Sequence, residues 1–203
     1  MGGNGSAFAP TIHPEGYNER RVRQTVSDIV QRHIDSDIEH GYSLNLDGTI
    51  RSANNIGTEA QVEIQNAIDA ITIHNHPAEN ATFSPQDIFG LAGEANGYMT
   101  IAYDRQMMYI LRRIDWKQGG SARYSLFGDE KDYREFAADY QKAMDRADET
   151  AKTRIRERIQ RGEITSREQC IAEGYRESNN ICRNWLRNPA QEYGYEYLEK
   201  RIK

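Results

Sequence analysis

Residues 70–87 constrain the fold of this chain most strongly, because they change from a strand pattern to a helix pattern within a few positions. Residues 70–73 are apolar or β-branched, so we expect a buried strand that extends through His76. Pro77 ends that strand, since proline has no N–H to donate to a sheet. Ser84 and Pro85 then have the residue types of a helix N-cap and first helical position, so we expect a helix that ends near Gly97. A buried strand joined closely to a helix predicts an α/β fold.

Periodicity predicts the other elements of the first half. Apolar residues spaced as on a helix, from Val22 to His33, predict an amphipathic helix that begins near Asn18. Tyr42, Leu44 and Leu46 alternate with polar residues before an Asp-Gly pair, which predicts a β-hairpin. Further strands are expected at residues 98–103 and 107–111, whereas residues 58–69 fit either a helix start or a short strand.

The second half has a different composition. Residues 1–114 contain 8 Lys/Arg and 14 Asp/Glu, whereas residues 115–203 contain 18 and 17. Charge-dense helices are expected at 129–161 and from the capping box at Ser166 to Asn188, with a short amphipathic tail after Pro189. Residues 1–17 are rich in Gly and Pro and indicate a disordered leader. We therefore expect a leader (1–17), an α/β domain (18–114) and an α-helical extension (115–203).

Composition disfavours several classes of protein. The net charge is -5 and the first half has no basic stripe, so nucleic acid is an unexpected partner. No apolar run approaches the ~18 residues that span a bilayer, which argues against a membrane protein. Cys170 and Cys182 are the only cysteines, without CxxC spacing, and no secretory signal is visible, so we expect a reduced cytoplasmic setting. The first six residues fit a loose myristoylation pattern, which we interpret as a flexible tail.

A candidate metal site lies at the end of the buried strand. Side chains alternate along a strand, so His74 and His76 project to the same face, which Thr72 shares. Asp87, in the first turn of the next helix, can fold back to supply an oxygen ligand. Two imidazoles and one carboxylate leave a fourth position for water, as in catalytic zinc sites. This ligand set predicts Zn²⁺ as the cofactor, although iron, cobalt or manganese could occupy the same ligands in vitro.

Catalysis at such a site requires a carboxylate. A zinc ion lowers the pKa of its bound water to ~7, and a nearby base must accept and return the proton. Glu39 is the choice for this base, because it precedes the hairpin strand and is followed by Gly41; Glu59 and Glu63 are the reserves. Ser84 could donate a hydrogen bond to the oxyanion of a tetrahedral intermediate.

Each of these residues also has an ordinary explanation. Ser84 and Asp87 form an N-cap and N3 pair that satisfies free helix N–H groups. The two histidines could be polar residues at a strand end. The combination favours metal binding, because the other three histidines lie elsewhere and chance rarely places His74, His76, Ser84 and Asp87 at this spacing.

The sequence His74-Asn75-His76-Pro77, six residues and then Ser84-Pro85-Gln86-Asp87 resembles the HxHPx6SxxD signature of the JAB/MPN (JAMM) zinc metalloprotease superfamily, particularly its RadC-like and prokaryotic JAB-domain branch. The resemblance covers about residues 20–114. It implies a cytidine-deaminase-like α/β sandwich whose mixed sheet is flanked by helices. It also implies that His74, His76 and Asp87 bind zinc, that Ser84 supports the intermediate, and that an upstream glutamate is the base. The distance of this glutamate from the motif varies in the family, so Glu39 rests on its Glu-x-Gly and hairpin context.

The resulting hypothesis is a zinc-dependent metallopeptidase or isopeptidase that hydrolyses an amide bond in a protein or peptide, a ubiquitin-like conjugate being one form of substrate. Two alternatives remain open. One is a non-catalytic adaptor of the same fold that binds a partner protein through the helical extension. The other is a RadC-like protein associated with DNA or a mobile element. The extension itself is expected to be a packed or partner-binding set of helices, or else a substrate-recognition lid over the site.

Overall fold

A mixed six-stranded sheet forms the centre of the molecule in a computed structural model that describes residues 14–77, 82–84, 87–88, 97–114, 116, 130–188 and 195–202. The strand order is β2-β1-β3-β4-β5-β6. Only β3 and β4 are parallel, and every other neighbouring pair is antiparallel. The strands are β1 (His40–Leu44), β2 (Ile50–Ile56), β3 (Ile71–Asn75), β4 (Met99–Tyr103), β5 (Met107–Arg113) and β6 (Tyr195–Arg201).

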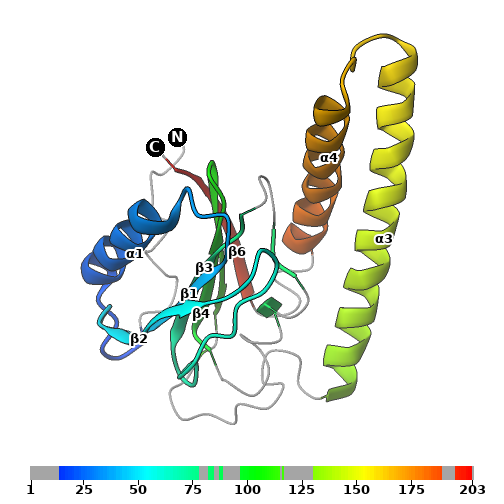
Figure 1. Cartoon of the computed structure of the whole chain (residues 1–203). Coiled ribbons are helices and arrows are strands. Elements are labelled where there is room, and N and C mark those ends of the chain that lie inside the picture. Colours follow the sequence, from blue (N-terminus) through cyan, green and yellow to red (C-terminus); the bar gives the residue numbers. More distant parts are fainter. Residues whose placement is uncertain are drawn as a thin grey trace, which may run out of the picture.

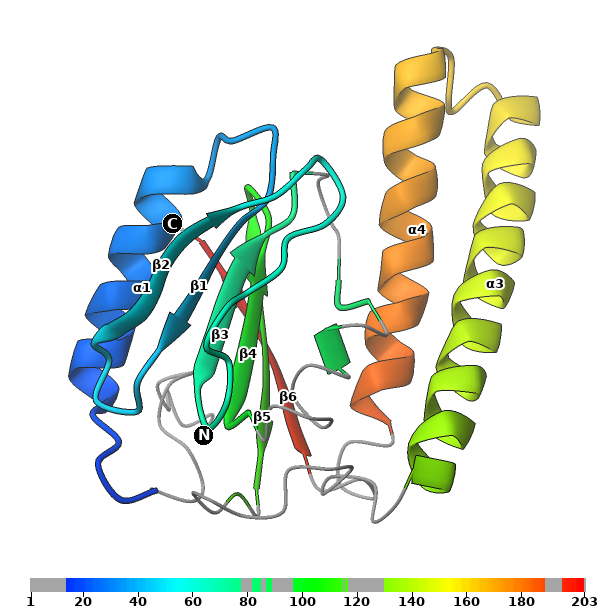
Figure 2. The same ribbon diagram turned by 60° about the horizontal axis from the view of Figure 1, so that its bottom comes forward.

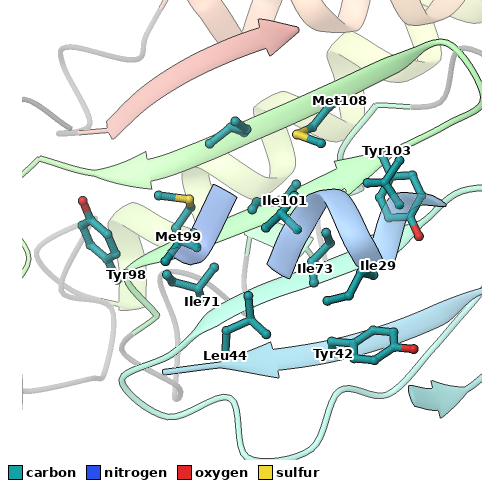
Figure 3. Close-up of a cluster of buried hydrophobic side chains, with 14 of the residues drawn as sticks. Ile29, Tyr42, Leu44, Ile71, Ile73, Tyr98, Met99, Ile101, Tyr103 and Met108 are labelled. Atoms are coloured by element: carbon teal, nitrogen blue, oxygen red, sulfur yellow. The ribbon is translucent and has the colours of Figure 1, made fainter. Parts of the chain in front are cut away.

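Helix α1 (Glu19–His33) covers one face of the sheet (Figures 1 and 2). Asn18 caps it by accepting a hydrogen bond from the Arg21 backbone N–H, as its residue type predicts. Its apolar stripe packs on side chains of β1, β3 and β4, several of which appear in Figure 3. Burying each such aliphatic side chain contributes about 1.5–3 kcal/mol, so this layer is a main source of stability. The cluster includes Val22, Val26, Ile29, Tyr42, Leu44, Ile71, Ile73, Met99 and Ile101.

A helical hairpin covers part of the opposite face. It consists of α3 (Glu130–Gln160) and α4 (Arg167–Arg187), which lie side by side in both views (Figures 1 and 2). Tyr140 and Leu186 are fully buried against side chains of β4, β5 and β6. The α3–α4 hairpin thus leaves the β1–β3 part of this face for other segments, and the candidate site lies there.

The structure confirms an α/β protein with a mixed sheet, and both long helices begin and end within two residues of the predicted bounds. Two boundaries differ from the sequence prediction. The tail expected to belong to a helical extension forms β6, which completes the sheet because it pairs with β5 and buries Tyr195. Tyr17, expected in the leader, packs edge-on against Tyr98 with ring centroids 5.5 Å apart.

Other predictions have different outcomes. Residues 58–69, left open between helix and strand, form turns and irregular backbone. Of the helix expected after Ser84, the structure describes a helical conformation at residues 87–88, and residues 89–96 lie outside the described part, as do residues 1–13. Among the described helices, none combines the length and the apolar character needed to cross a membrane.

Candidate metal centre

Strand β3 positions the two histidines near the middle of the sheet. His74 lies between Gly41 of β1 and Ala102 of β4 in the hydrogen-bonded register. His76, two residues later, extends from the same face, and its backbone N–H donates to the Tyr103 carbonyl at 2.7 Å. Both imidazoles are therefore held by backbone that is paired on the β4 side.

The Ser84–Asp87 turn brings the carboxylate to the histidines. Asp87 Oδ2 accepts hydrogen bonds from the Ser84 backbone N–H at 2.7 Å and from Ser84 Oγ at 2.8 Å. The Asp87 N–H donates in return to Ser84 Oγ at 3.2 Å. The other carboxylate oxygen, Oδ1, lies 3.2 Å from His74 Nε2. The helix-cap interpretation and the ligand interpretation are thus compatible, because the cap uses one oxygen and orients the other toward His74.

The three side chains have the spacing of a ligand set. The Nε2 atoms of His74 and His76 are 2.8 Å apart, and His76 Nε2 is 4.0 Å from Asp87 Oδ2. One ligand atom from each residue lies within 4.8 Å of the others. A tetrahedral zinc ion with bonds of ~2.05 Å places its ligand atoms roughly 3.3 Å apart. The described residues therefore fit a zinc ion with small side-chain adjustments.

Electrostatics keep the carboxylate charged. Burial opposes the charged form of Asp87, but His74, His76 and the Ser84 N–H together hold the pKa of Asp87 well below its ordinary value. Burial also acts to lower the pKa of His74, yet Asp87 and Glu39 outweigh it and raise that pKa. Each of the two groups thus stabilises the charged form of the other. A divalent cation would compete with protons for these groups, because metal ligands must give up their protons.

Glu39 lies in the same cavity as the three candidate ligands. It is 7% exposed and immediately precedes β1. Burial raises the pKa of its carboxyl, the charge of His74 lowers it and that of Asp87 raises it further, with a net increase. A partly desolvated carboxyl with a raised pKa beside a metal-ligand cluster is suited to proton transfer near neutral pH.

The reserve glutamates are less favourably placed. Glu59 lines the cavity but its side chain is exposed. Glu63 is exposed and is absent from the described lining. Burial therefore distinguishes Glu39 from both reserves.

The cavity has a volume of about 620 Å³. The segment around Ser84 contributes to one wall, and another is formed by Glu59, Ala60, Gln61, Val62, Ile64 and Ala67. Gly41 lies beneath this second wall, where a Cβ atom would stand 2.6 Å from Ile64 Cγ1 and 3.2 Å from Val62 Cγ2. The glycine of the Glu-x-Gly pattern therefore has a local reason: it leaves room for the wall beside Glu39.

Other residues support the site through contacts to which the sequence analysis assigned no role. Thr72 Oγ1 donates to Thr100 Oγ1 at 3.0 Å, and both line the cavity. The buried Tyr140 hydroxyl of α3 donates to the Phe83 carbonyl at 2.6 Å, next to Ser84. For Thr72, the shared strand face was the available signal. For Tyr140 no signal existed, since the contact joins positions 57 residues apart.

Comparisons of this chain with protein-family models, curated proteins and solved structures find no match.

Proposed function

We propose that this protein is a zinc-dependent hydrolase of the JAB/MPN type that cleaves a peptide or isopeptide bond. One observation carries the proposal: two imidazole nitrogens and a carboxylate oxygen converge in a cavity that also contains a buried glutamate. A structural metal site requires no such glutamate, whereas metal-assisted hydrolysis requires a group that moves protons. The HxHPx6SxxD resemblance adds support, because the same residues provide every role that the signature implies.

Each residue has a defined task in this proposal. His74, His76 and Asp87 hold the ion, which when bound supplies Lewis acidity and polarises water. The Glu39 carboxylate accepts the proton of the attacking water and returns it to the leaving amine. The Ser84 hydroxyl, now bonded to Asp87, lies in the cavity where it could donate to the developing oxyanion. When the hydroxyl proton turns to the oxyanion, the bonds from the Ser84 N–H to Asp87 Oδ2 and from the Asp87 N–H to Ser84 Oγ still hold Asp87 in place.

The charge of the cavity favours a neutral or basic substrate. Its described lining contains three acidic residues, Glu39, Glu59 and Asp87, and no Lys or Arg. The sequence itself has no Lys or Arg from residue 52 to residue 104. Recognition of a free C-terminal carboxylate or a phosphate usually uses such a cation. We therefore infer cleavage of an internal or side-chain amide rather than removal of C-terminal residues.

Nucleic-acid binding receives little support from the helices. Many of their cations form ion pairs with neighbouring acids, for example Arg154 with Glu177 and Arg158 with Glu173. Because these arginines are paired with acidic side chains, they do not form a uniformly basic surface that could bind phosphates. An adaptor role has one specific observation in its favour, since Ile159, Ile171 and Tyr175 are 45%, 49% and 59% exposed around a cavity of about 380 Å³ on the α3–α4 hairpin.

The test is turnover by the zinc-loaded protein on internally quenched peptides and lysine isopeptide conjugates. Glu39→Gln should keep its zinc and lose about 10²–10⁴-fold in rate, the usual contribution of a general base. Glu63→Gln is the matched control, because this exposed glutamate is outside the described lining, and it should retain full activity. Full activity in Glu39→Gln would remove Glu39 from the mechanism. One bound zinc without turnover on any amide would favour the adaptor.

A further inference from the structure

Asn75, between the two histidine ligands, makes two hydrogen bonds that are not needed to bind a metal. Its side-chain Oδ1 accepts from the His40 backbone N–H at 2.6 Å. Its Nδ2 donates to the Ile38 carbonyl at 2.9 Å. The side chain is buried, with the residue 2% exposed. Asn75 thus binds the backbone on both sides of Glu39.

These bonds hold Glu39 from one side while other backbone holds it from the opposite side. In extended backbone, the polar groups of successive residues point to opposite edges. The Glu39 N–H donates to the Thr58 carbonyl at 2.7 Å, and the Glu39 carbonyl accepts from the Gly57 N–H at 2.9 Å. The groups of residues 38 and 40 face the other edge, where Asn75 meets them. Residue 39 is therefore fixed at both edges, and its side chain has a defined direction.

Next to residues 38–40, the Asn75 side-chain amide makes the hydrogen bonds that the backbone of a neighbouring strand would otherwise make. The paired register of β1 with β3 runs from Leu44 opposite Ile71 to Gly41 opposite His74 and goes no further. Beyond it, the His76 N–H is bonded to β4, and Pro77 has no N–H to offer. The primary amide of Asn75 presents an N–H donor and a C=O acceptor side by side, as a strand backbone does. Asparagine is the residue type that supplies both groups from this position.

We propose that Asn75 is a positioning residue that fixes the Glu39 carboxylate relative to the metal ligands. The inference depends on the proposed function, because it assigns Asn75 a task in the same reaction. Asn75 touches neither substrate nor ion in this role. It connects the base to the ligand segment, since His74 and His76 are the residues directly before and after it in the sequence.

The variants Asn75→Ala and Asn75→Asp test the two bonds. Alanine removes both, whereas aspartate retains an acceptor for His40 and loses the donor to Ile38. Each should lower kcat by about 10–100-fold, the usual cost of removing a group that orients a reactive residue, with KM and zinc stoichiometry unchanged. Asn55→Ala is the matched control: Asn55 Nδ2 also donates to a β1 carbonyl, that of Gly41 at 3.1 Å, but does not flank Glu39. It should retain its kcat.

A double variant separates positioning from general support of the fold. If Asn75 acts through Glu39, adding Asn75→Ala to Glu39→Gln should cause no further loss of kcat. An equal further loss in that background would overturn the proposal. Loss of zinc from the Asn75 variants would also overturn it, as would global unfolding of both variants.

A second measurement decides the inference even if the protein hydrolyses no amide and the proposed function fails. In zinc-loaded protein with ¹³C-labelled glutamate, the Glu39 carboxyl signal can be assigned by its loss in Glu39→Gln. We expect this signal to shift in Asn75→Ala and to stay in place in Asn55→Ala. An unchanged Glu39 signal in Asn75→Ala would overturn the positioning role whatever the turnover.

Discussion

Replacing Tyr140 with phenylalanine removes one hydroxyl from the contact between α3 and the segment that carries Ser84 and Asp87. The ring of Tyr140 is fully buried and would keep its packing. The Phe83 carbonyl would lose the donor that now lies 2.6 Å away. Because Phe83 is 1% exposed, water has little access to replace that donor. An unsatisfied buried carbonyl costs about 1–3 kcal/mol, so Tyr140→Phe should lower the free energy of unfolding by this amount.

Part of this loss should appear in metal binding, because the weakened contact lies beside Asp87, a proposed metal ligand. If about 1 kcal/mol falls on docking of the Ser84–Asp87 turn, zinc affinity should fall roughly fivefold. Urea denaturation of the metal-free protein measures the first effect, and competition with a chromophoric chelator measures the second.

Tyr195→Phe is the matched control, since the buried Tyr195 hydroxyl donates to the Leu186 carbonyl at 2.7 Å, away from the site. It should lose similar stability and keep its zinc affinity. Equal zinc affinity in Tyr140→Phe and the wild type would refute the reasoning.

Three further predictions concern pH, packing and substrate. Burial, with the charges of His40 and Arg32, lowers the pKa of His33 from 6.5 to about 4. Between these pH values His33 is protonated in the unfolded chain but not in the folded protein. The free energy of unfolding should therefore fall as the pH drops from about 6.5 to 4. Urea denaturation in the presence of EDTA, which removes metal, should show a smaller fall for His33→Gln than for the wild type. Gly41→Ala should lose about 1–3 kcal/mol of unfolding free energy through its clash with Ile64, whereas Gly174→Ala, with open space around its Cβ, should not. Peptides with lysine beside the scissile amide should be cleaved faster than matched peptides with glutamate, and the reverse order would contradict the charge argument.

Local patterns predicted the elements whose packing agrees with their periodicity. The stripe from Val22 to His33 was buried as expected, and Ser166 caps α4 by accepting from the Gln169 N–H. The strand and turn around His74 and Asp87 were also predicted, because each is specified within a few residues.

Long-range pairing explains what the sequence did not predict. The sequence near Tyr195 alternates too weakly to identify β6, and its strand conformation depends on pairing with β5. The place of Glu39 in the site depends on residues that follow it in the chain, since Thr58 and Asn75 fix the backbone around it. A Glu-x-Gly pattern identifies the residue, but only the assembled sheet shows what holds it.

The most direct test of this account is the stoichiometry and coordination of zinc in the purified chain. Zinc titration should show one tightly bound ion, and X-ray absorption should show a nitrogen and oxygen shell at ~2.0–2.1 Å that includes two imidazoles. The variants His76→Ala and Asp87→Ala should lose this ion. A wild-type chain that binds no stoichiometric zinc, or variants that bind it as well as the wild type, would contradict the proposed metal site.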